Sequence, residues 1–262
     1  MCGRFALNDT ASQLAEHFTL SGEPDLFASW NIAPSMRISV IREAGARERE
    51  LGGRHLVRMR WGLIPSWAKD ATISNKLANA RGETVAEKPS FRSAFRHRRC
   101  IIPASGFYEW MAGKGVKQPW FVSFKSGEPM ALAGIWETWQ PVAGEAIESC
   151  CIITTAANSL MEPIHDRMPV ILDREQWKVW LGPDLILPPA RRGESVREPE
   201  IRVSHAMDLP LQGGNADGLV RLLHMIRPHD SDSMRAWPVT REVNRVGLRD
   251  DAGLTELLHP GE

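Results

Sequence analysis

Residues 99–110 are Arg-Cys-Ile-Ile-Pro-Ala-Ser-Gly-Phe-Tyr-Glu-Trp. This stretch contains two short runs of β-branched and aromatic residues, Arg99–Ile102 and Gly106–Trp110, with Pro103 in the gap and Gly106 at the start of the second run. Runs of this kind, separated by proline and glycine, predict two consecutive strands instead of one long element. The middle of the chain is therefore expected to be β structure.

Similar runs lie on both sides of this stretch. Each is short, rich in β-branched or aromatic residues, and bounded by proline, glycine or polar clusters. The further predicted strands span 37–42, 55–61, 119–124, 131–136, 150–154 and 169–172. Because the strands are many and short, the sheet is expected to be curved and mostly antiparallel.

Helices are expected at only three places. The first begins near 9–10, the second runs over 173–181 with Asp173 as a suitable N-cap, and a short third spans 219–225. Residues 182–218 carry much proline, glycine and charge, which predicts an extended loop. The sequence thus predicts an α+β fold with a barrel-like β core and flanking helices.

Charge and cysteine content narrow the classes of function. The chain has 32 basic and 32 acidic residues, so nucleic-acid binding would require a local patch. No apolar run approaches the roughly 20 residues of a membrane span, and the N-terminus lacks a secretory signal. The four cysteines show neither a CxxC motif nor a zinc-binding spacing. We therefore expect a cytoplasmic protein without a metal.

Cys2 is the first candidate for chemistry because a small residue at position 2 permits removal of Met1. Removal would leave an α-amine and a thiol on one residue, with reference pKa values of roughly 7.7–8.0 and about 8.5. Such an aminothiol forms a Schiff base with an aldehyde and then closes a thiazolidine ring. Gly3 allows close approach, and Arg4 adds a cation that favours a thiolate or a phosphate. The alternative is a small residue in a mobile terminus.

Three polar residues lie among aromatic-rich motifs between positions 61 and 110. Asn79 can donate and accept hydrogen bonds at once, and Arg81 offers a planar fork for phosphate. Glu109 lies on the predicted strand Gly106–Trp110, where a buried carboxyl would suit proton transfer. A strand glutamate that faces solvent or pairs with an arginine is the alternative.

Two further segments could contribute. Residues 88–99 hold five Lys or Arg residues, no acidic residue and two phenylalanines, a mixture that suits single-stranded nucleic acid. A solvated charged face is the alternative. His165 lies between Pro163 and Pro169 in a restricted loop and titrates close to neutrality, so it could move protons. A structural histidine is the alternative there.

Taken together, the motifs resemble the SOS-response-associated peptidase (SRAP) family, whose members shield abasic sites in single-stranded DNA. The matching segments, in family order, are CGRF at 2–5, NIAPS at 31–35, WGLIPSW at 61–67, NARGET at 79–84, KPSFRSAFRHRRCIIPASGFYEW at 88–110, LAGIWE at 132–137, TTAAN at 154–158, IHDRMPVIL at 164–172 and WPVTREVN at 237–244. So many ordered matches are specific, whereas each alone is weak. The resemblance implies a single SRAP domain over 1–244, including the 182–218 loop, and a polar tail over 245–262.

The resemblance also implies a reaction. Met1 would be removed and Cys2 would attack the ring-opened sugar of an abasic site, which links protein and DNA without a cofactor. Asn79 would hold the sugar or orient the Cys2 amine, and Glu109 and His165 would carry protons. The residues that would contact the DNA are Arg4, Asn31, Trp67, Arg81 and Arg167. The expected partner is single-stranded DNA that contains abasic sites, bound by a monomer.

Ser105 departs from the resemblance, because aspartate is often found there. Three alternatives stay open. An N-terminal-nucleophile amidohydrolase can also begin Met-Cys-Gly, but it usually needs an Asn-Gly pair, which this chain lacks. A peptidase that cleaves other proteins and a non-covalent single-strand-binding module are the others.

Overall fold

The structure is a computed structural model that describes residues 2–22, 24–43, 53–112, 115–182 and 215–258. Its strands are β1 (Arg4–Leu7), β2 (Ser29–Ile32), β3 (Arg37–Glu43), β4 (Arg54–Trp61), β5 (Asn79–Arg81), β6 (Arg99–Ala104), β7 (Gly106–Met111), β8 (Gln118–Phe124), β9 (Met130–Trp139), β10 (Ile147–Ala156), β11 (Arg167–Pro169) and β12 (Met234–Pro238). Its α-helices are α1 (Ala11–Phe18), α2 (Arg92–His97), α3 (Trp177–Leu181) and α5 (Asn215–His224). Its 3-10 helices are η1 (Ala71–Lys76), η2 (Gly82–Thr84), η3 (Arg174–Gln176), η5 (Ser231–Ser233), η6 (Arg241–Asn244) and η7 (Ala252–Leu254).

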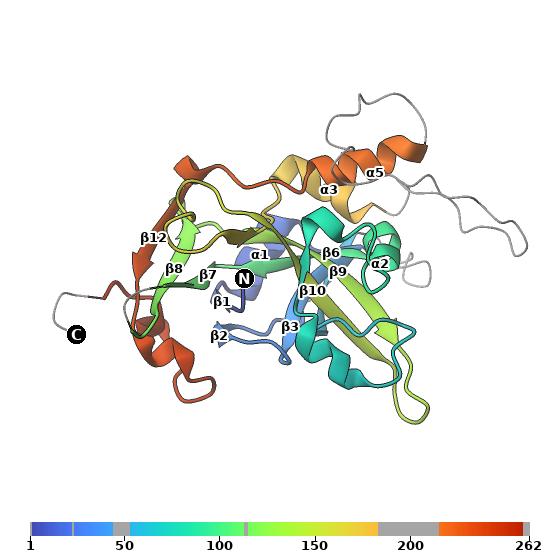
Figure 1. Ribbon diagram of the computed structural model, residues 1–262, viewed down its shortest axis with the longest axis horizontal. Coiled ribbons are helices and arrows are strands. Elements are labelled where there is room, and N and C mark those ends of the chain that lie inside the picture. The colour runs from blue at the N-terminus through green and yellow to red at the C-terminus, as the bar shows by residue number, and fades with distance from the viewer. Residues whose placement is uncertain (1, 23, 44–52, 113–114, 183–214, 259–262) are drawn as a thin grey trace, which may run out of the picture.

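The strands form two sheets (Figure 1). One is an open sheet in the order β12-β8-β7-β1-β2. In the other, β10, β4, β3, β6 and β9 follow one another, and β9 pairs again with β10, which closes a barrel. Pairing is antiparallel except where β10 runs alongside β4 and β5. The predicted α+β fold with a curved, barrel-like and mostly antiparallel core is confirmed.

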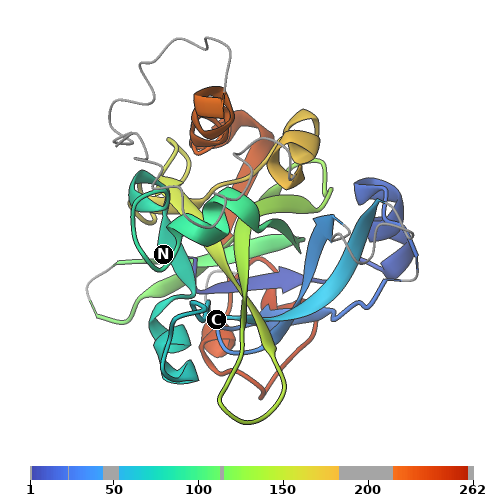
Figure 2. The same ribbon diagram turned by 90° about the vertical axis from the view of Figure 1, so that its right-hand side faces the viewer.

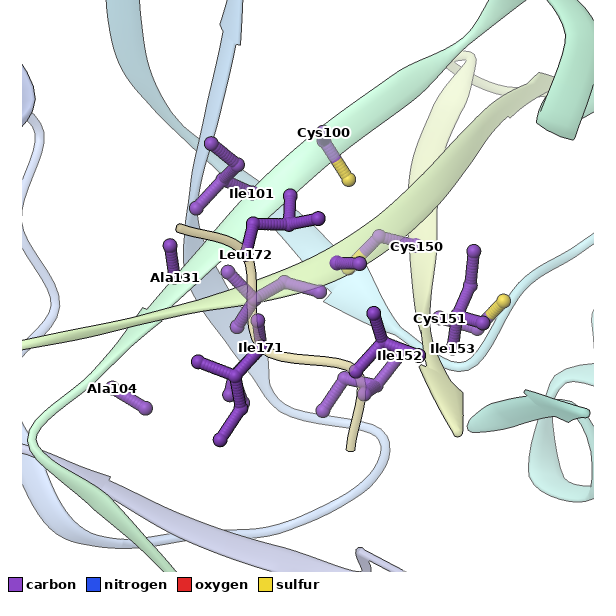
Figure 3. Packing of buried hydrophobic residues seen from close by; sticks show 14 of the residues in the cluster. Cys100, Ile101, Ala104, Ala131, Cys150, Cys151, Ile152, Ile153, Ile171 and Leu172 are labelled. Atoms are coloured by element: carbon purple, nitrogen blue, oxygen red, sulfur yellow. The ribbon is translucent and has the colours of Figure 1, made fainter. Parts of the chain in front are cut away.

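Small and branched apolar side chains on the barrel strands are buried and pack into one core, among them Cys100, Ile101 and Ile152 (Figure 3). Gly134 on β9 lets the strands approach closely, since a Cβ there would lie 2.5 Å from Ile102 Cδ1 and 2.9 Å from Cys100 Sγ. The cysteines are free thiols. Burial raises the pKa of the Cys150 thiol, which suits an inert core residue.

The helices flank this core, with α3 and α5 at the same end of the molecule in both views (Figures 1 and 2). The helix predicted near 9–10 is α1, capped by Thr10 and Gln13 in a reciprocal capping box. The helix predicted over 173–181 starts with the 3-10 turn η3, for which Asp173 is the N-cap, and continues as α3. None of the helices described is long and apolar enough to cross a membrane.

Some boundaries differ from the predictions. α5 begins at Asn215, inside the loop predicted over 182–218, because the buried Val220, Leu222 and Leu223 offset the low helix propensity of Gly218. The part of that loop over 183–214 lies outside the described residues.

The strand predicted over 169–172 is also misplaced, since β11 ends at Pro169 and Ile171 makes only an isolated bridge with Leu132. The prediction missed the short strands β1, β2, β5 and β12 and the helix α2. Strands of three to five residues carry too little alternation to be recognised, and pairing with neighbouring strands stabilises them.

The segment after Asn244 packs against the open sheet as far as the structure describes it. The Trp237 indole donates to the Thr255 carbonyl at 2.8 Å, and the Leu258 amide donates to the Pro238 carbonyl at 2.9 Å. Leu254 is fully buried. The domain boundary at 244 stays a prediction.

Arg99, at the start of β6, joins two helices to the barrel. It is only 4% exposed, and its guanidinium donates to the carbonyls of Phe95 (2.9 Å) and Arg96 at the end of α2. It also donates to the carbonyls of Trp180 (2.6 Å) and Gly182 at the end of α3. Burial lowers the pKa of Arg99 to about 10, so the side chain stays charged at neutral pH. A cation at two helix C-termini satisfies carbonyls that would otherwise be orphaned.

Arg99→Met is expected to lower the free energy of unfolding by about 3 kcal/mol or more, because several buried carbonyls lose their donor. Urea denaturation followed by circular dichroism measures this. Arg92→Met is the matched control: Arg92 lies on α2 but is exposed, and its replacement should change stability by less than about 0.5 kcal/mol. Equal stability of both variants would contradict the role given to Arg99.

Candidate active site around Cys2

Cys2 is held inside the protein by the strand that follows it. β1 lies between β7 and β2, with Arg4 opposite Tyr108 and Phe5 opposite both Phe107 and Ile32. Cys2 is two residues ahead of this strand and has no exposed surface. The alternative of a residue in a mobile terminus is therefore wrong for Cys2.

Asn79 connects the second sheet to Cys2. It starts β5, which pairs with β10 so that Asn79 lies beside Ile152. Asn79 Nδ2 donates to the Cys2 carbonyl at 2.9 Å. Asn79 Oδ1 is buried and accepts no hydrogen bond from the residues described. One side of the carboxamide thus fixes the Cys2 backbone, and the other remains available as an acceptor.

Glu109 completes a group of three around the cysteine. It lies on β7 opposite Trp120 and is only 2% exposed. Burial, and then the negative charge of Glu109, raise the pKa of the Cys2 thiol, whereas a hydrogen bond from the Arg4 backbone N–H lowers it. The net direction is upward, so the thiol is protonated at neutral pH. The alternative of a solvent-facing strand glutamate is wrong for Glu109.

Arg4 and Asn31 form a pair next to this group. Arg4 Nη1 donates to Asn31 Oδ1 and to the Val243 carbonyl, both at 2.6 Å, and Asn31 Nδ2 donates to the same carbonyl at 3.3 Å. The guanidinium of Arg4 lies 6.0 Å from the ring centroid of Trp110, whose indole donates to Asn244 at 2.7 Å. Partial burial lowers the pKa of Arg4. The two predicted residues are thus brought together by the C-terminal segment.

Arg167 and Arg81 lie on strands that flank β10, on β11 and β5. Arg167 forms a two-point ion pair with Glu83, with Nη2 to Oε2 at 2.9 Å, and donates to the Thr154 carbonyl at 2.8 Å. The hydrogen bond from Arg167 holds the pKa of Glu83 below its usual range. Arg81 is exposed and makes no hydrogen bond or ion pair with the described part of the chain.

His165 lies in the turn before β11. Its Nδ1 accepts a hydrogen bond from the Arg167 backbone N–H at 3.0 Å, and Asp166 Oδ1 lies 2.8 Å from the same nitrogen. β11 is two strands away from Asn79, since β10 lies between β11 and β5. The group around Cys2 therefore includes Asn79 and Glu109, and His165 precedes the strand on the other side of β10 from β5.

Trp67 stands at the surface in the loop between β4 and β5. It is 57% exposed, and its indole lies 3.4 Å from the Pro89 carbonyl. The two phenylalanines of the basic stretch, Phe91 and Phe95, are buried instead. They are core residues and offer no stacking face, so an interleaved binding surface over 88–99 is wrong for these rings.

Several partners of the predicted residues carried no recognisable signal. Val243 contributes a backbone carbonyl, which no residue type reveals, and Glu83 is the charge partner of Arg167 within the NARGET segment. Ser105, where the family often has aspartate, donates to the Asp9 carboxylate, so an acidic group is retained nearby. Among the residues described, no cluster of His, Cys, Asp or Glu could hold a metal ion.

The fold and the site define a class of protein: a closed barrel and an open sheet that meet at a buried cysteine near the N-terminus, with a carboxamide and a carboxylate beside it. The chain belongs to the SOS response associated peptidase (SRAP) family, whose model matches residues 1–189.

Individual relatives agree with this assignment. The chain is 44% identical over 252 residues to the abasic site processing protein YobE of Bacillus subtilis, covering 95% of this chain and 98% of YobE. It is 39% identical over 248 residues to YoqW of the same organism, also named an abasic site processing protein, covering 93% and 94%. A crystal structure of a Bacteroides thetaiotaomicron protein, 23% identical, superposes with a TM-score of 0.75 over 98% of this chain and 100% of that protein. That likeness shows the fold.

Glu109→Gln is expected to speed alkylation of Cys2, because removing the negative charge lowers the pKa of the thiol. The rate with iodoacetamide at a pH of about 8.5 should rise about threefold or more, measured by mass spectrometry of the N-terminal peptide. Glu137→Gln is the control, since Glu137 is also buried but does not perturb the thiol. An unchanged rate in a folded Glu109 variant would argue against the proximity of the two groups.

Proposed function

We propose that this protein captures abasic sites in single-stranded DNA by a covalent bond to Cys2 after Met1 has been removed. The supporting observation is the enclosure of Cys2 between two sheets, with Asn79 bonded to its carbonyl and Glu109 near its thiol. The family and the names of the relatives point the same way. The relatives with these names align with nearly the whole length of this chain.

The reaction follows from the two nucleophiles of one terminal residue. The α-amine adds to the C1 aldehyde of the ring-opened sugar and releases water, which forms a C=N bond. The thiol then adds to that carbon as its proton passes to the nitrogen, which forms a C–S bond and closes a five-membered thiazolidine ring. No oxidant, reductant or cofactor is required.

The neighbouring residues suit these steps. Asn79 holds the Cys2 carbonyl, and this fixes the direction of the amine, while its free Oδ1 can accept a hydrogen bond from a sugar hydroxyl. Glu109, a buried carboxyl group whose charge acts on the thiol, is the candidate to take the thiol proton. His165 is the second candidate for proton transfer during ring opening.

The predicted DNA contacts fall into two groups. Arg81 and Trp67 are exposed, which suits contact with a phosphate and stacking against a base. Arg4 and Arg167 are partly enclosed and already hold Asn31 and Glu83, so they are pre-positioned before DNA arrives. A phosphate at Arg167 must share the guanidinium with Glu83. Arginine–phosphate contacts should make initial capture weaker as salt rises, with little dependence on base sequence.

An oligonucleotide with one abasic site should give a protein–DNA band that survives a denaturing gel. Cys2→Ala should lose this band, because the thiol that closes the ring is absent. Cys2→Ser keeps the amine and should give a band only after borohydride reduction of the imine. Adding salt after the reaction should not release the DNA.

Mass measurement of the intact protein is the control, because retained Met1 would block the α-amine. A stable band with Cys2→Ala would show that the linkage does not use the thiol. DNA binding without any band from the processed protein would favour the non-covalent binding module.

Asn79→Ala is expected to slow crosslinking roughly tenfold or more, because the Cys2 backbone and the sugar both lose a positioning contact. The initial rate of band formation measures this. Asn75→Ala, an exposed asparagine in η1, is the matched control and should react at the original rate. Equal rates for the two variants would remove Asn79 from the proposed mechanism.

A further inference from the structure

Three arginines lie on one face of the ribbon formed by β3 and β4. Arg37 is directly opposite Arg60, and Ser39 is directly opposite Arg58. Residues opposite each other share a face of an antiparallel pair, as do residues two apart on one strand. Arg37, Arg58 and Arg60 therefore form one group, called the arginine ribbon below.

Among the residues that the structure describes, no acidic side chain neutralises this group. In the part of the chain that the structure describes, none of the three arginines forms an ion pair. They donate to backbone carbonyls: Arg37 and Arg58 to each other's at 3.3 Å, and Arg60 to that of Ser35 at 3.1 Å. Carbonyl groups orient a guanidinium but do not neutralise its positive charge. The ribbon is thus a local positive patch on a chain whose formal net charge is zero.

The arrangement costs stability. Like charges directly opposite on paired strands repel each other, so the contact between Arg37 and Arg60 is unfavourable in the isolated protein. Residues that reduce stability are commonly found where a protein contacts a ligand. An aromatic ring also lies here, because the guanidinium of Arg58 is 4.8 Å from the ring centroid of Phe27. Cations next to an aromatic ring suit a nucleic-acid strand.

The ribbon adjoins segments that lead into the site. Arg37 follows the turn that leaves β2, where Asn31 lies, and six residues span at most about 20 Å. Arg60 Nε lies 3.4 Å from Ser74 Oγ in η1, in the loop that carries Trp67 and leads to Asn79. At about 3.4 Å per nucleotide, this distance is covered by about six nucleotides, and by fewer if the strand is extended.

We propose that the arginine ribbon binds the phosphate backbone of the DNA strand a few nucleotides away from the abasic site. This inference rests on the proposed function and adds a second region of the protein that contacts the DNA. The ribbon contributes affinity for the flanking strand, whereas the chemistry at Cys2 needs only the lesion. Its loss should therefore weaken the binding of long strands and spare the reaction of short ones.

The test uses a tetrahydrofuran abasic analogue, which has no aldehyde, so that non-covalent binding can be measured by fluorescence anisotropy. Three oligonucleotides are compared: one with flanks of about three nucleotides, and two extended to about fifteen on the 5′ or the 3′ side. The variant is Arg37→Gln/Arg58→Gln/Arg60→Gln, with Arg37→Gln alone as a milder change. The control Lys117→Gln/Lys178→Gln/Arg221→Gln removes three exposed charges elsewhere.

For one long oligonucleotide, the triple ribbon variant should lower the slope of log K against log salt by about 2, from three contacts at about 0.7 each. The same variant should bind the short oligonucleotide and crosslink a short abasic strand as well as the unsubstituted protein does. Its melting temperature should not fall. Unchanged binding of both long oligonucleotides, or an equal effect of the control variant, would overturn the proposal. If the unsubstituted protein formed no crosslink with an abasic strand, that result would instead refute the proposed function.

Discussion

The pairing of β1 with both β7 and β2 is the constraint on which the site depends. A chain terminus is normally the most mobile part of a domain, yet here backbone hydrogen bonds on both edges of β1 fix residues 4–7. The position of Cys2 follows from this pairing, because only Gly3 separates Cys2 from the strand. Glu109 lies on β7, the partner strand, so the same register that holds β1 brings the carboxylate to the thiol.

The second requirement is that the two sheets stay together. The bond from Asn79 to the Cys2 carbonyl crosses from β5, which belongs to the barrel system, to the terminus that belongs to the open sheet. Trp61 supports this junction, since its ring lies 5.2 Å from that of Phe5 and its indole donates to the Ala78 carbonyl. On the other side, the Val243 carbonyl binds both Arg4 and Asn31. The site is thus assembled from segments at both ends of the chain.

The sequence predicted the elements that are rich in β-branched residues and the overall fold class. It missed β1, β2, β5 and β12, because a strand of three to five residues has almost no period of its own. Those short strands are the ones that carry Arg4, Asn31, Asn79 and Arg81, so the local pattern is weakest where the candidate site is built.

The individual site residues were identified from motifs and from a family resemblance, which report residue identity. Their partners, such as the Val243 carbonyl and Glu83, depend on tertiary contacts that no local pattern encodes. Phe91 and Phe95 show the opposite case. Their spacing among basic residues suggested a nucleic-acid surface, but both rings are buried in the core.

The enclosure of Cys2 also determines how exposed the thiol is to oxidation. Peroxides oxidise thiolates far faster than thiols, and they must reach the sulfur to do so. A thiol with no exposed surface and a raised pKa meets neither condition. In the function proposed above, this arrangement would keep the nucleophile intact until it meets an abasic site, since sulfenic acid at that position would abolish ring closure.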